Sequence, residues 1–157
     1  MGREKVRTGA IDATPTGGRV FTLEEANRAL VLVRRIVKDI VDRYAEVTAL
    51  RAEREELSRA LGPAEKLDNL RARTEERVAE LNRLSDELGE LGCELKDWAS
   101  GLVDFPALHQ GRRVCLCWRL GESAIAQWHE IDAGFAGRKP IEADFGTTRV
   151  TESEKPG

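Results

Sequence analysis

Apolar residues recur every seven positions through the first half of the chain, and no other feature limits the fold as strongly. Two series keep a three–four spacing: Leu23, Leu30, Val37 and Tyr44, together with Ala26, Val33, Ile40 and Val47. This spacing places one continuous apolar seam along an α-helix, which is the pattern of a coiled coil. The seam predicts a long helix that must pack against another helix.

Local signals place both ends of this helix. Thr22 suits the N-cap, and Glu25 follows three residues later as its capping-box partner. Gly62 and Pro63 predict the end of the helix, because glycine suits the C-terminal cap and proline cannot continue a helix.

The heptad pattern returns in a second predicted helix, over residues 64–93. Its two series are Leu67, Thr74, Leu81, Leu88 and Leu95, and Leu70, Leu84, Leu91 and Trp98. Arg77 interrupts the second series, and we expect Val78 to cover the gap. A short Gly-Pro connection between two long helices predicts an antiparallel, coiled-coil-like hairpin. Because a helix pair alone buries little surface, we expect a homodimer through the helical hairpin. The alternative is that the C-terminal module covers the seam.

Strand signals appear only after the helices. Residues 94–105 are extended or turning, and residues 113–120 form the best strand, bounded by Gly111 and Gly121. Residues 124–131 follow a turn and form either the second strand of a β-hairpin or a short helix.

The predicted fold class is therefore α+β, mainly α: a long antiparallel helical hairpin followed by a small β-hairpin-containing module. We divide the chain into a disordered N-terminal segment (1–20), the hairpin (21–98), an aromatic-rich module (99–145) and a disordered tail (146–157).

Composition excludes several classes of function. The net charge is -3, whereas a nucleic-acid-binding protein normally carries a basic surplus, so we expect no nucleic-acid partner. The chain has no apolar run of roughly 20 residues, so we expect no membrane association. Three cysteines make an odd count without a disulfide framework, which favours a cytoplasmic location.

Several motifs carry a resemblance to a known family. The predicted first helix begins with FTLEEANRAL, from Phe21, and the C-terminal part of the chain contains GLVDFPAL, CWRLGE and WHEIDAGFAGRKP. Together these motifs resemble the bacterial family called domain of unknown function 2203, over about residues 20–142. The resemblance implies that this stretch is the ordered part of the chain, and it implies no activity, cofactor or catalytic residue.

The C-terminal module concentrates the residue types that bind transition metals. The candidates are His109, Cys115, Cys117, His129 and Glu130, flanked by Asp104 and Asp132. Imidazole and thiolate are the usual ligands of zinc, iron or copper, and a strand would place Cys115 and Cys117 on one face. The alternative is that both cysteines are small apolar core residues, since Cys-x-Cys matches no zinc-finger spacing.

Two other kinds of site are weaker candidates. His129 would need a carboxylate such as Asp104 or Asp132, or the second imidazole, for acid–base chemistry, and no hydrolase or nucleotide-binding motif is present. A Gly-rich turn near Arg138 and Lys139, with Arg112 nearby, could hold an anion, although such turns usually face solvent.

These patterns favour a non-enzymatic, self-associating scaffold or interaction protein. The alternative is a transition-metal-binding protein whose site lies in the C-terminal module. The sequence assigns no substrate and no reaction, so whether the protein is an enzyme stays open.

Overall fold

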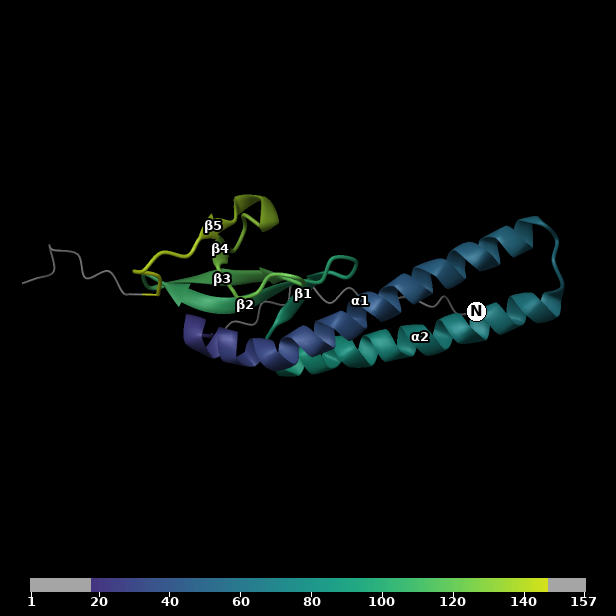
Figure 1. Ribbon diagram of the computed structural model, residues 1–157, viewed down its shortest axis with the longest axis horizontal. Helices are drawn as coiled ribbons and strands as arrows, with labels where there is room; N and C mark the ends of the chain where they lie inside the picture. The colour runs from purple at the N-terminus through teal and green to yellow at the C-terminus, as the bar shows by residue number, and fades with distance from the viewer. Residues whose placement is uncertain (1–17, 147–157) are drawn as a thin grey trace, which may run out of the picture.

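Two long helices form the predicted antiparallel hairpin (Figure 1). The structure, a computed structural model, describes residues 18–146. Residues 1–17 and 147–157, within the two segments predicted to be disordered, lie outside the described part. Helix α1 spans Leu23–Arg59 and helix α2 spans Ala64–Glu90. Within residues 18–146, no helix is long and apolar enough to cross a membrane.

The predicted capping box starts α1. The Thr22 hydroxyl accepts a hydrogen bond from the Glu25 amide at 3.0 Å, and the Glu25 carboxylate accepts one from the Thr22 amide at 3.0 Å. The helix ends ahead of Gly62, where Leu61 already has a φ of 57°. Helix α2 stops three residues before the predicted end, and Gly92 follows with a φ of +99°, a conformation that suits glycine.

The heptad residues form the seam between the helices, as predicted. Its buried members include Leu30, Val33, Val37, Ile40 and Val47 on α1, and Leu70, Val78, Leu81 and Leu88 on α2. Val78 is buried beside the half-buried Arg77, which confirms that it covers the gap in the second series.

A five-stranded antiparallel sheet follows the hairpin, with its strands in sequence order. Its strands are β1 (Glu94–Asp97), β2 (Leu102–His109), β3 (Arg112–Arg119), β4 (Gln127–Glu130) and β5 (Lys139–Pro140), with a short 3-10 helix, η1 (Phe135–Gly137), before β5. Strand β4 resolves the choice left open for residues 124–131, because it pairs with β3 as the predicted hairpin. The predicted division after residue 98 places β1 with the helices, whereas its backbone pairs with β2 in the sheet.

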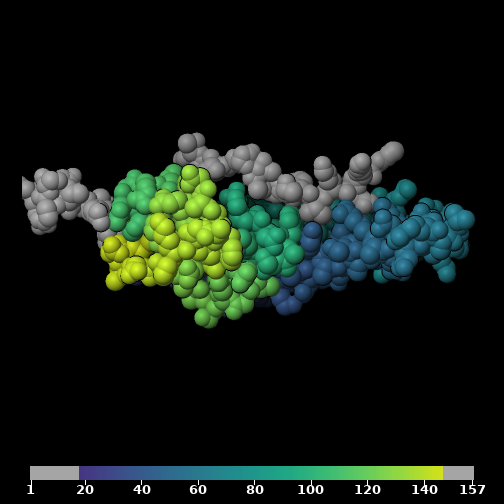
Figure 2. Space-filling view, turned by 90° about the horizontal axis from the view of Figure 1, so that it is seen from above, coloured from purple at the N-terminus to yellow at the C-terminus, as the bar shows by residue number. Residues whose placement is uncertain are grey.

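One face of the sheet packs on the helices. The register pairs Phe105 with Leu116 and Leu116 with Trp128, and these buried side chains join one core with the seam of α1 and α2. The contact is close at Gly101, where an added Cβ would lie 2.8 Å from a methyl carbon of Val37. The sheet therefore lies over one half of the hairpin, and the other half extends beyond it (Figures 1 and 2).

Candidate metal centre

The opposite face of the sheet carries a buried polar cluster. Asp104 lies on β2, Cys117 on β3 and His129 on β4, and strand alternation directs all three to the face away from the helices. Asp104 pairs directly with Cys117 in the register, while His129 pairs with Cys115. One ligand atom from each of Asp104, Cys117 and His129 lies within 4.8 Å of the others. All three residues are buried.

Two hydrogen bonds fix the orientation of the His129 ring. Its Nδ1 lies 2.7 Å from the backbone oxygen of Glu130, and its Nε2 lies 3.1 Å from Oδ1 of Asp104. A carbonyl oxygen only accepts, so Nδ1 carries a proton and donates. Nε2 is therefore the nitrogen that faces the carboxylate. Two lone pairs at 3.1 Å would repel, so a proton or a metal ion must lie between them.

In the metal-free protein a proton lies there. The hydrogen bond to Asp104 raises the pKa of His129 to about 10, and the Cys117 side chain and the Glu130 carbonyl act in the same direction. Near neutral pH, His129 and Asp104 thus form a buried ion pair. A transition metal is the other species that satisfies this geometry, because it takes a nitrogen lone pair and a carboxylate oxygen together.

A pocket of about 300 Å³ opens onto the cluster. Asp104, Cys115 and His129 line it. Burial raises the pKa of the Cys115 thiol to about 12, and the charge of Asp104 acts in the same direction. Cys115 is therefore a neutral thiol rather than a nucleophile at neutral pH.

Charged residues of both signs surround the pocket. Lys96 and Arg113 line it together with Glu94 and Asp132, and Lys96 lies 3.8 Å from the Glu94 carboxylate. The lining charges balance, so the pocket has no general preference for anions or cations.

The predicted metal ligands divide between the two faces of the sheet. Cys115 and Cys117 lie on one face of β3, as their period-two spacing indicates, and His129 on β4 lies beside them. His109 and Glu130 occupy the helix-facing register positions, so they do not join the cluster. Asp104, which the sequence offered only as a flanking residue, is the carboxylate that completes it. The available signal was a lone carboxylate inside the apolar run 102–108.

The three candidate anion-binding residues are each paired with a carboxylate. Arg112 donates from Nε to Glu130 at 3.1 Å, and the Lys139 amine lies 3.7 Å from the same carboxylate. Arg138 instead donates to Glu122 at 2.9 Å. Their charges are compensated within the protein, and Arg138 does not share a site with the other two.

Fold and site together define a class: helical-hairpin proteins whose small antiparallel sheet carries a buried carboxylate–thiol–imidazole cluster. The chain belongs to the family described as "Uncharacterized conserved protein (DUF2203)", whose model matches residues 19–141. This match confirms the resemblance seen in the sequence, and it includes all three residues of the cluster. No curated protein and no solved structure matches the chain.

Proposed function

We propose that the protein binds one transition-metal ion through Asp104, Cys117 and His129. The observation that carries this proposal is the orientation of the His129 ring. Its Nδ1 donates a hydrogen bond to a backbone carbonyl, while its Nε2 faces Asp104. A hydrogen bond from the second ring nitrogen to a carbonyl is the usual support of a metal-ligating histidine.

The donor set favours zinc over iron or copper. One imidazole, one thiolate and one carboxylate are all ordinary zinc ligands, and three protein ligands leave one coordination position open. Ligand atoms around zinc lie about 3.2–3.8 Å apart, so the cluster, now within 4.8 Å, would contract slightly on binding. The open position would face the pocket lined by Cys115. A ligating thiolate must stay reduced, which agrees with three free cysteines and a cytoplasmic location.

Metal analysis of the untagged protein tests this proposal. We expect about one equivalent of zinc per chain after purification without chelators. After removal of the metal, Co²⁺ should produce a sulfur-to-cobalt charge-transfer band that Zn²⁺ abolishes. The absence of bound metal, together with no cobalt band at millimolar Co²⁺, would contradict the proposal.

Matched variants identify the ligands. His129→Gln and Cys117→Ser should weaken metal binding at least about 100-fold, because each removes a donor. His109→Gln changes the other histidine, and Cys93→Ser changes a buried cysteine outside the cluster. We expect both of these controls to bind metal normally. Equal losses in ligand variants and controls would assign the effect to unfolding.

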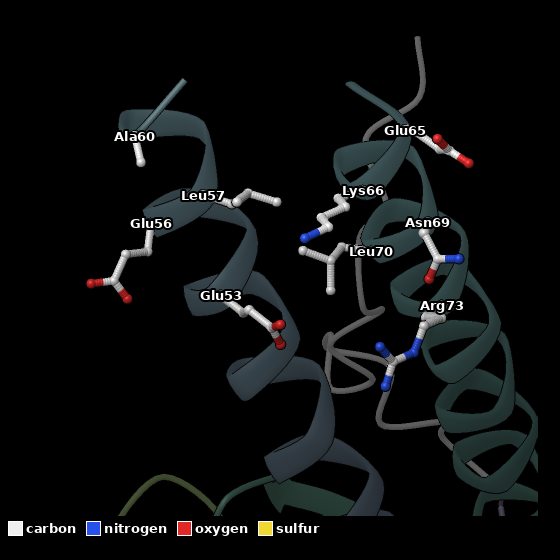
Figure 3. A pocket seen from close by; sticks show the side chains of 9 residues that line it. All are labelled: Glu53, Glu56, Leu57, Ala60, Glu65, Lys66, Asn69, Leu70 and Arg73. Carbon is white, nitrogen blue, oxygen red and sulfur yellow. The ribbon is translucent and has the colours of Figure 1, made fainter. Parts of the chain in front are cut away.

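We infer a second role, self-association through the distal part of the hairpin, defined here as residues 51–69. None of these residues is buried. The helices diverge there and leave a pocket of about 740 Å³ between them. Leu57 and Leu70 point toward one another across this gap (Figure 3). Leu57 and Leu67 are only half-buried there and Leu61 is exposed. This uncovered apolar surface favours a second copy as the covering partner, which makes the protein an interaction scaffold.

The charges around the gap suit an identical partner. Glu53, Glu56 and Glu65 line the same pocket as Lys66 and Arg73. Both signs occur on one surface, so two copies related by a two-fold axis can place acidic groups against basic ones.

The mass in solution tests self-association. Light scattering of the full chain should return about 35 kDa, twice the chain mass of 17.5 kDa. Leu61→Asn should weaken the dimer at least about tenfold, since Leu61 is 90% exposed and its loss removes only apolar surface. Asparagine also accepts the positive φ of this position. The control Val31→Asn alters an exposed residue outside residues 51–69 and should leave the mass unchanged. A mass near 17.5 kDa at every concentration would exclude the dimer.

A further inference from the structure

Three aromatic rings meet where the described chain ends, on the helix-facing side of the sheet. Phe145 stacks on the His109 ring, with centroids 4.6 Å apart and planes within 5°. Trp128 lies against both rings, with centroids at 4.8 Å from His109 and 5.6 Å from Phe145. His109 is buried in this cluster. These contacts hold the segment 142–146 on the sheet, away from the proposed metal ligands.

One hydrogen bond completes this attachment. The Gly146 amide donates to Nδ1 of His109 at 2.9 Å. An amide nitrogen only donates, so Nδ1 must offer a lone pair and the ring must be neutral, with its proton on Nε2. A second proton on the ring would set one N–H against another and remove the bond.

From this geometry we propose that His109 is a pH-sensitive latch for segment 142–146. The neutral ring holds the segment in place. Protonation removes the acceptor and places a charge on a buried ring, so acidification releases the segment and exposes Trp128 and His109. The proposal is independent of metal binding, since none of the ligands contributes to the latch.

The groups around His109 agree with this direction. Burial is the main cause that lowers the pKa of His109 below its ordinary value of 6.5, and Arg112 on β3 adds to it. Asp144 in the segment and Glu130 on β4 oppose the shift, and Lys139 on β5 supports it. A histidine with a lowered pKa stabilises the closed form above pH 6.5, and this contribution is lost as the pH falls. Below this value the opening equilibrium should rise by up to about tenfold per pH unit, until the closed form itself is protonated.

Nuclear magnetic resonance of the ¹⁵N-labelled full chain tests the latch. At about pH 7.5 the His109 ring should carry its proton on Nε2, and the Gly146 amide should be protected from exchange. As the pH is lowered from 6.5, this protection, corrected for intrinsic exchange, should fall in step with the titration of the His109 ring nitrogens. The Leu116 amide in the core serves as the internal reference for global unfolding.

His109→Gln is the matched variant, because glutamine offers an oxygen acceptor and does not titrate. Any Gly146 protection that remains in it should not change with pH. Three results would overturn the proposal in the unaltered chain. These are a proton on Nδ1 at neutral pH, protection that persists after His109 has titrated, and protection that is lost only together with that of Leu116.

Discussion

Asp104→Ala is expected to lower the free energy of unfolding of the metal-free protein by about 3–5 kcal/mol. The substitution leaves the buried His129 without its carboxylate, and the ring must either lose its proton or remain an uncompensated charge. Urea denaturation at neutral pH, after the metal has been removed, measures the loss.

Asp104→Asn is the matched control. The asparagine keeps the shape of the side chain and can donate a hydrogen bond to a neutral His129, so we expect a smaller loss, about 1–2 kcal/mol. Equal effects of alanine and asparagine would show that the negative charge of Asp104 contributes nothing. A change below about 1 kcal/mol for alanine would contradict the buried ion pair itself.

Raising the pH should destabilise the metal-free protein over a defined range. The pKa of His129 is about 10 in the folded protein and ordinarily 6.5, so its contribution is complete below pH 6.5 and is lost as the pH rises toward 10. Between pH 6.5 and about pH 8.5 the free energy of unfolding should fall by about 2–3 kcal/mol. Urea denaturation at several pH values in this interval measures the slope.

The predicted interval ends at about pH 8.5 because two thiols also change the free energy of unfolding at higher pH. Burial is the main cause that raises the pKa of Cys93 and of Cys115 from 9.0 to about 12, so their ionisation in the unfolded chain also favours unfolding at higher pH. Below about pH 8.5 the slope belongs mainly to His129. We expect His129→Gln to flatten it, and an unchanged slope in that variant would assign the pH dependence to another group.

The helices were predictable because their seam repeats over many turns and is bounded by strong capping signals. The capping box at Thr22 and the stop ahead of Gly62 both lie where the local sequence places them. Residues 94–105 were expected to be extended or turning, but a strand at β1 was not predicted, because Leu95 and Trp98 also continue the heptad series. Strand β2 was hidden by Pro106, which is rare in a strand with neighbours on both sides.

Strand alternation was the only sequence signal that predicted part of the site. A period of two places Cys115 and Cys117 on one face, but the partner of each residue depends on the register between strands. A tight turn at Gln110 and Gly111, with φ values of 54° and 80°, sets that register and brings Asp104 opposite Cys117. The single sequence contains the turn residues, yet it does not reveal which carboxylate they align with the thiol.

The distal part of the hairpin, residues 51–69, shares none of the buried side chains that join the helices to the sheet. Adding or deleting seven residues in both helices together would keep the leucines in phase, because the repeat itself has that period. The loop at Gly62 could thus move outward or inward by about 10 Å for each repeat. The length of the distal part of the hairpin can therefore change in discrete steps during evolution, with little effect on the cluster of Asp104, Cys117 and His129 on the sheet.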